Sequence, residues 1–158
     1  MNEQEVRIKI EAAIQKLIDH DRPLLEIDVN ERTITHRLAI YIEELFPEWK
    51  VDCEYNRLFD QSKQIVVTKK ILSMEGNGTT SVTDEHAKTV YPDIIIHHRI
   101  STDNLVIIEV KKTTNRTPDN ADIGKLQAYK EQIGYVYAVF LRLRTGVKDV
   151  GKERLEIF

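Results

Sequence analysis

The sequence is poor in cysteine, and Cys53 is the only one among 158 residues. A single cysteine excludes an internal disulfide and every metal site built from several cysteines. Cys53 lies in a predicted strand, where we expect it to pack as a small apolar side chain. No motif around it indicates a reactive thiol.

Long apolar runs are also missing from the chain. The longest uncharged apolar run is far shorter than the roughly 20 residues that a membrane-spanning helix needs. The first residues, MNEQEVRIKIE, carry charges where a signal peptide has an apolar segment. A content of 41% hydrophobic and 31% charged residues is typical of a soluble globular protein of one domain. We therefore expect a cytoplasmic protein with no membrane partner and one domain over residues 1–158.

The net charge of −3 lacks the excess of basic residues that is usual in nucleic-acid-binding domains. The charge is nevertheless unevenly distributed along the chain. Residues 1–60 carry 8 Lys and Arg against 14 Asp and Glu, whereas residues 61–158 carry 15 against 12. The basic part favours contact with phosphate groups, although an ordinary solvated surface explains the same balance nearly as well.

Two consecutive apolar strands are predicted within YPDIIIHHRISTDNLVIIEVKK, residues 91–112. The first begins with Pro-Asp and the second ends with Glu-x-Lys. Because successive side chains of a strand alternate between its faces, Leu105, Ile107, Glu109 and Lys111 should share one face. A lone buried charge on such an apolar face would be costly. A divalent metal ion is the best candidate partner for these charges.

Asp93, fifteen intervening residues and then Glu109-Val110-Lys111 resemble the PD-(D/E)XK motif of the restriction-endonuclease-like nuclease superfamily. The resemblance implies an α/β fold with a restriction-endonuclease-like core, in which a mixed central sheet is flanked by helices in the order αβββαβ. It also implies that Asp93 and Glu109 are metal ligands and that Lys111 acts near the attacking water. The backbone carbonyl of Val110 offers a further metal ligand.

The implied reaction is metal-dependent hydrolysis of phosphodiester bonds, with nucleic acid as the partner and DNA favoured over RNA. Mg²⁺ prefers oxygen ligands and needs only one or two carboxylates beside substrate phosphate, and we expect Mn²⁺ to substitute for it. The ion would activate a bound water and polarise the phosphate, while the Lys111 ammonium would stabilise developing charge. A homodimer would be one way to cut both strands, and a separate targeting subunit is another expected partner.

A different interpretation of the same residues stays open. Asp93 would then be a turn residue at the start of a strand, and Glu109 and Lys111 would form an ordinary surface ion pair, which contributes little to stability. In that case the chain is a non-cleaving nucleic-acid-binding or protein-assembly module on the same fold.

Two helices are predicted before residue 50. Apolar residues at helical spacing predict the first within residues 1–20, from Asn2 to about Asp19, with Arg22-Pro23 closing it. The second is predicted from Glu31 to Phe46, with Asn30 as N-cap and Pro47 at its end.

Glu31 falls on the buried face of the second helix, in the direction of Leu38 and Ile42. In the superfamily an acidic residue of the helix before the sheet often completes the metal site, so the resemblance makes Glu31 a candidate catalytic residue. The alternative is a carboxylate favoured by the helix dipole in the first turn. His36 projects away from the apolar stripe and is expected at the surface or behind the metal ligands.

The stretch between the second helix and Tyr91 is less regular. Residues 50–57 predict a strand with Val51, Cys53 and Tyr55 on one face. Residues 58–89 predict an insertion with a mobile loop, because they contain a polar, aperiodic segment with two glycines. Such a loop suggests a flap that contacts substrate, with Lys69 and Lys70 beside it.

The final third predicts a helix followed by a strand. The helix runs from Asp119 to Ile133 and ends at Gly134, with Leu126 and Tyr129 on its buried side. Lys125 and Gln127 resemble polar residues that related nucleases place near the site, and a plain surface helix is the alternative. Residues 135–143 predict a β-strand of the sheet and residues 154–158 a short edge strand. His97 is predicted to be too far along its strand from Asp93 to share a metal.

Overall fold

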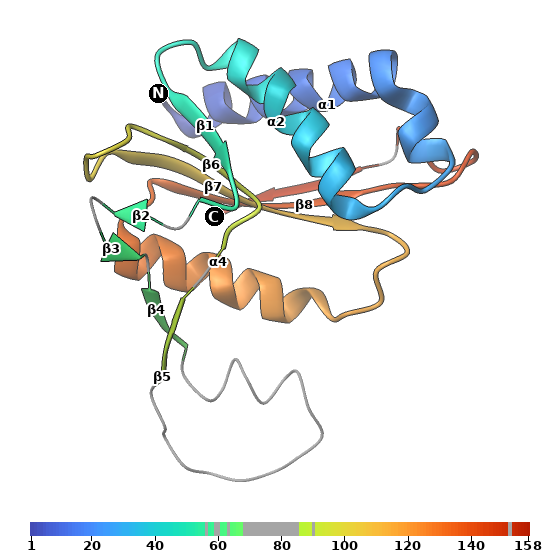
Figure 1. Cartoon of the computed structure of the whole chain (residues 1–158). Coiled ribbons are helices and arrows are strands. Elements are labelled where there is room, and N and C mark those ends of the chain that lie inside the picture. Colours follow the sequence, from blue (N-terminus) through green and yellow to red (C-terminus); the bar gives the residue numbers. More distant parts are fainter. Residues whose placement is uncertain (56, 59–60, 63, 68–85, 90, 152) are drawn as a thin grey trace, which may run out of the picture.

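The computed structural model describes the backbone of residues 1–55, 57–58, 61–62, 64–67, 86–89, 91–151 and 153–158. It describes the side chains of residues 1–55, 91–151 and 153–158. Most of the predicted insertion, including Lys69, Lys70 and the predicted mobile loop, therefore lies outside the described residues. The described elements form a central sheet between two helical layers (Figure 1).

The central sheet has five strands in the order β1-β6-β7-β8-β9. The strands are β1 (Lys50–Cys53), β6 (Ile94–His97), β7 (Asn104–Lys112), β8 (Tyr137–Leu143) and β9 (Arg154–Ile157). β7 and β8 are parallel and the other neighbours are antiparallel. The predicted α/β class with a mixed central sheet is confirmed, and residues 154–157 form the predicted edge strand.

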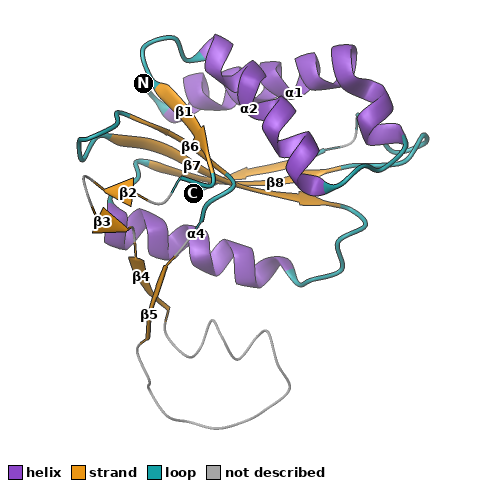
Figure 2. Cartoon of the chain, in the orientation of Figure 1, coloured by secondary structure: helices purple, strands orange, loops and turns teal. Residues whose placement is uncertain are grey.

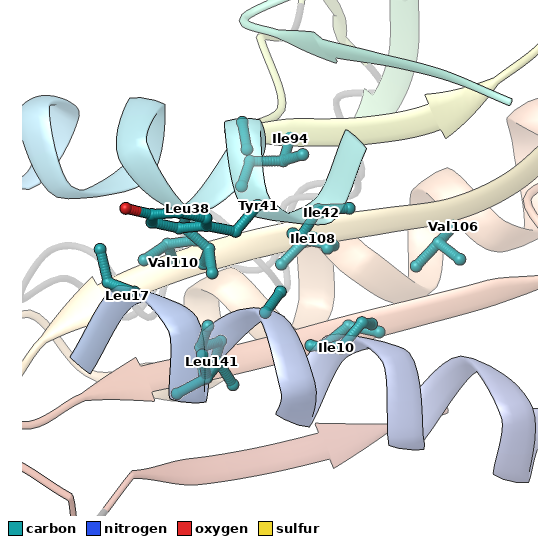
Figure 3. Close-up of a cluster of buried hydrophobic side chains, with 14 of the residues drawn as sticks. Ile10, Leu17, Leu38, Tyr41, Ile42, Ile94, Val106, Ile108, Val110 and Leu141 are labelled. Atoms are coloured by element: carbon teal, nitrogen blue, oxygen red, sulfur yellow. The ribbon is translucent and has the colours of Figure 1, made fainter. Parts of the chain in front are cut away.

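In the part of the chain that the structure describes, three helices cover the sheet. These are α1 (Glu3–Glu26) and α2 (Glu31–Leu45) on one face and α4 (Asp119–Ile133) on the other (Figure 2). Between the paired helices and the sheet lies the larger apolar core, which includes Ile10, Leu38, Ile108 and Leu141 (Figure 3). A second core lies under α4. Burial on both faces explains why β6 and β7 read as almost continuous apolar runs.

The boundaries of α2 and α4 agree with their sequence signals. Asn30 caps α2 by accepting a hydrogen bond from the N–H of Thr33 at 2.8 Å. α4 begins at Asp119 and ends at Gly134, whose φ of 81° gives the left-handed cap that glycine adopts readily. Leu126 and Tyr129 are buried beneath it, as predicted.

The predicted end of the first helix at Arg22-Pro23 is wrong, since α1 extends to Glu26. The helix kinks at Asp21, which has non-helical φ and ψ angles. Pro23 then lies in the first turn after the kink, where its missing N–H has no helical partner to lose. The kink therefore lets proline continue a helix that it would otherwise end.

One side chain of β7 faces the opposite way from the prediction. Ile107 packs in the core under α4, whereas Leu105 packs in the larger core with Val106. The pairing of β6 with β7 shifts at this point, because Ile96 pairs with Val106 but His97 pairs with Asn104. Leu105 is left over on β7 and forms a β-bulge, so its side chain lies on the opposite face from the one that simple alternation predicts.

β1 is shorter than predicted and ends at Cys53. Glu54 has a φ of 50°, and this left-handed residue interrupts the alternation of faces. Tyr55 therefore packs against the core under α4, while Val51 packs in the larger core. Cys53 is exposed rather than packed inside, because it is the last residue of an edge strand.

Between β1 and β6 in the chain, the described residues include four short strands. They form two antiparallel pairs, β2 (Arg57–Leu58) with β3 (Gln61–Ser62) and β4 (Gln64–Val67) with β5 (His86–Thr89). The β4 backbone lies beside α4 (Figure 1). The predicted insertion thus contains paired strands next to the helix that covers one face of the sheet.

No helix in the described part of the chain combines the length and apolar character that crossing a bilayer requires.

Candidate active site

Asp93 lies immediately before β6 and reaches across to the neighbouring strand. Its Oδ2 accepts a hydrogen bond from the backbone N–H of Val110 in β7 at 2.7 Å. Burial raises the pKa of Asp93 to about 6, and the carboxylate of Glu31 contributes to this rise. The hydrogen bond from Val110 acts in the opposite direction and lowers the pKa. The structure therefore brings Asp93 next to the Glu109-Val110-Lys111 segment.

Glu109 is half-buried near the end of β7. Burial and the nearby Asp93 carboxylate raise the pKa of Glu109 well above its ordinary value. Asp122 and Glu31 act in the same direction, whereas the ammonium of Lys125 opposes them. The two carboxylates predicted as metal ligands thus lie within each other's electrostatic field.

Lys111 lies on the side of β7 that faces α4, with its side chain only 3% exposed. Its Nζ is 2.6 Å from Oδ2 of Asp122, 3.4 Å from the carbonyl oxygen of Pro118 and 3.7 Å from Oδ1 of Asp119. The ion pairs described for Lys111 therefore go to α4 rather than to Glu109. This burial differs from the exposed surface pair that the alternative interpretation requires.

Glu31, the first residue of α2, joins this helix to the end of β7. Its Oε2 accepts a hydrogen bond from the backbone N–H of Lys112 at 2.9 Å. The Lys112 side chain in turn donates to the carbonyl oxygen of Val29 at 2.7 Å. These contacts place Glu31 where its charge acts on Asp93 and Glu109. The backbone hydrogen bond is a role that neither interpretation of Glu31 included.

Asp122 is the residue of this arrangement that the sequence did not reveal. Its Oδ2 binds Lys111, and its Oδ1 lies 3.3 Å from Nζ of Lys125. An aspartate in the first turn of a helix is also favoured by the helix dipole, so nothing in the local sequence distinguishes it. Lys125 does lie near Glu109, whereas Gln127 is exposed.

A pocket of about 410 Å³ lies beside Asp93. It is lined by Glu31, Arg32, Thr35 and His36 of α2, by Cys53 and Glu54 at the end of β1, and by Asp93. Desolvation and the nearby Asp93 carboxylate raise the pKa of the Cys53 thiol to about 11, so it stays protonated at neutral pH. That Cys53 is not a reactive thiol stays a prediction.

His97 and His98 contact residues of β1 and of the segments on either side of it. The Nε2 of His97 lies 2.9 Å from Oδ2 of Asp52, and its ring contacts that of Tyr55. His98 stacks on Trp49 with ring centroids 4.3 Å apart. That His97 lies too far from Asp93 to share a metal ion stays a prediction.

The donors that could hold a metal ion are few. Among the side chains that the structure describes, no three from His, Cys, Asp and Glu converge closely enough to form a metal site. Asp93 and Glu109 nevertheless offer two carboxylates of the kind that suits Mg²⁺, which commonly takes one or two from the protein and keeps several waters. Val110 contributes its N–H to Asp93, and its carbonyl as a ligand stays a prediction.

No family model, curated protein or solved structure matches this chain. Its function is therefore inferred from its own residues and their geometry.

Proposed function

We propose that the chain is a metal-dependent nuclease that hydrolyses phosphodiester bonds, with DNA favoured over RNA as the substrate. The observation that carries the proposal is the meeting of Asp93 and Glu109 beside a buried Lys111. Asp93 is held against β7 by the N–H of Val110. Burial raises the pKa of both carboxyl groups, and repulsion by the Asp93 carboxylate raises that of Glu109 further. A bound divalent cation would relieve this repulsion.

The order of the elements supports a restriction-endonuclease-like core. α2, β1, β6, β7, α4 and β8 follow one another as helix, three strands, helix and strand, and the last strand lies parallel to β7. The strands β2 to β5 interrupt this order between β1 and β6. The proposed core therefore contains an insertion between β1 and β6.

Asp93 and Glu109 would hold Mg²⁺, with Mn²⁺ able to replace it and the Val110 carbonyl as a further donor. The ion supplies Lewis-acid activation of water and phosphate. Glu31 would add negative charge from the start of α2, while its bond to the Lys112 N–H keeps that helix against the end of β7.

Lys111 would place a positive charge next to the attacking water and the phosphate. Residues two apart on one strand face lie about 6.6 Å apart along the strand, so Lys111 follows Glu109 at a distance that a phosphate group can bridge. The hydrogen bond to Asp122 at 2.6 Å keeps the ammonium at this end of β7. Such a fixed charge stabilises the negative charge that develops during hydrolysis.

The same ion pair favours a second candidate function. Lys111 is almost fully buried and already bound to Asp122, an arrangement that also occurs in purely structural pairs. In that case the chain is a non-cleaving nucleic-acid-binding or protein-assembly module on the same fold. Under the nuclease proposal, a homodimer or a separate targeting subunit would direct the cut.

The test is cleavage of labelled single-stranded, double-stranded and branched DNA and RNA in Mg²⁺, Mn²⁺ or EDTA. We expect metal-dependent cutting by the natural chain and none by Lys111→Met or Asp93→Asn, with both variants folded by circular dichroism. Lys16→Met is the matched control, since Lys16 makes a 2.6 Å ion pair to Glu44 on the surface. Full activity of Lys111→Met would overturn the assigned roles, and binding without cutting by the natural chain would favour the second candidate.

A further inference from the structure

The pocket beside Asp93 is lined by two residues of the candidate active site, the proposed metal ligand Asp93 and the proposed catalytic residue Glu31. Its volume of about 410 Å³ falls at the lower end of the range for small-molecule sites, roughly 300 to 1,000 Å³. A second hollow at the start of α2 shares Glu31, Arg32 and His36 with it. An occupant of the pocket would therefore lie beside the candidate metal site and continue into a groove along α2.

Thr35 gives the pocket an unsatisfied hydrogen-bonding group. The residue is 6% exposed, and its Oγ1 has no hydrogen-bond partner among the described residues. A threonine within a helix can bond to the carbonyl four residues earlier, which here would be that of Glu31, but this bond is not made. Leaving a buried hydroxyl unpaired costs about 1–3 kcal/mol. A ligand group in the pocket would remove this cost.

Glu54, which follows β1, also lines the pocket and has a strained backbone. Its φ of 50° is unfavourable for a residue with a side chain. Its N–H donates to the carbonyl oxygens of Pro92 at 3.1 Å and Asp93 at 3.3 Å, which fixes this part of the pocket against the candidate site. Its carboxylate binds the exposed Arg32, which lines the same pocket, at 2.7 Å. Strain of this kind concentrates at binding sites.

The charges of the pocket favour a neutral ligand rich in hydrogen-bond donors. Three carboxylates, from Glu31, Glu54 and Asp93, face one guanidinium, that of Arg32. A phosphate group inside would be repelled by these carboxylates. The amino and imino groups of a base and the hydroxyl groups of a sugar are donors that carboxylates accept, and the Thr35 hydroxyl can donate or accept.

We propose that this pocket receives one nucleoside of a nucleic-acid strand, next to the phosphodiester bond that is cut, an inference that rests on the proposed function. The base and sugar occupy the space between Thr35 and Glu54. The strand continues along the hollow at the start of α2, where the exposed Arg32 borders both spaces. Thr35 is then a residue that positions the substrate rather than one that takes part in hydrolysis.

The test is a titration of the isotope-labelled full chain in EDTA with each of the four deoxynucleosides at millimolar concentrations, followed by backbone amide NMR signals. We expect saturable shifts at Thr35, Cys53 and Glu54, and binding about 5- to 10-fold weaker in Thr35→Val, which keeps the shape and removes the hydroxyl. Thr145→Val is the matched control, because Thr145 is equally buried and its hydroxyl contacts Thr113. This control should bind like the natural chain.

The outcomes separate this inference from the nuclease proposal. Metal-dependent cutting without saturable shifts at the pocket would overturn the nucleoside site and leave the nuclease standing. Equal affinity of Thr35→Val and the natural chain would also overturn it. Saturable nucleoside binding in a chain that cuts nothing would retain the pocket as a nucleoside site and overturn the nuclease. Shifts with Mg²⁺ alone, in a separate titration without EDTA, would identify a cation site in place of the nucleoside site.

Discussion

Replacing Asp93 with asparagine should stabilise the protein above neutral pH although it removes a proposed metal ligand. Burial and the neighbouring Glu31 carboxylate raise the pKa of Asp93 to about 6, despite the hydrogen bond from Val110. An asparagine carbonyl can still accept the N–H of Val110, which Asp93 binds at 2.7 Å. The substitution therefore removes a charge that the fold disfavours and keeps the contact that positions the side chain.

The magnitude follows from the proton linkage of this one group. Asp93 has an ordinary pKa of 3.8 and a folded pKa of about 6, so the folded chain binds the proton more tightly than the unfolded chain. Its contribution to stability is full below the ordinary pKa and is lost as the pH rises through about 6. At about 1.4 kcal/mol per pH unit the loss is roughly 3 kcal/mol. Asparagine should recover about 2 kcal/mol of it, because its hydrogen bond to Val110 is weaker than that of a carboxylate.

The assay is urea unfolding of the natural chain and Asp93→Asn in EDTA, at about pH 4 and about pH 8. The variant should be the more stable protein at the higher pH, and its advantage should disappear in acid. Asp21→Asn is a control of opposite sign, because hydrogen bonds from Tyr41 and Arg37 outweigh burial and lower the pKa of Asp21. This control should be less stable than the natural chain at the higher pH. A destabilised Asp93→Asn at about pH 8 would refute the reasoning.

Other substitutions test the buried ion pair, a strained turn and the packing of α4. Asp122→Asn should lower the free energy of unfolding by about 3 kcal/mol, and adding Lys111→Met should restore part of that loss, because a buried ammonium without this partner costs more than an apolar side chain. Urea unfolding of both single variants and the double variant measures this, and a double variant that is the least stable of them would contradict it. Ile100→Asn should raise the free energy of unfolding by about 1 kcal/mol, because asparagine tolerates a left-handed backbone better than isoleucine does. Ile100 has a φ of 59° and is 77% exposed, so little packing is lost, and a higher Tm would show the gain. Leu126→Ala should cost about 3 kcal/mol in urea, because Leu126 is fully buried under α4; a cost under about 1 kcal/mol would mean that α4 packs loosely.

The sequence predicted the ends of helices correctly where a capping residue alone decides them. Asn30 caps α2, and Gly134 ends α4, because capping depends on a few adjacent residues. Local signals failed at Pro23, which a kink accommodates within α1. They failed again at Leu105, which a β-bulge turns to the other face. Both failures arise where the backbone departs from regular geometry, and periodicity assumes that it does not.

The sequence by itself identified Asp93, Glu109 and Lys111 as candidate residues and placed them on consecutive strands. Only the tertiary structure decided that Asp93 bonds to the β7 backbone and that Lys111 pairs with Asp122 of α4. Strand alternation says which face a side chain occupies, but not which helix covers that face or how much water remains there. The pKa of a carboxyl group and the shape of a pocket depend on those neighbours, which come together from distant parts of the chain.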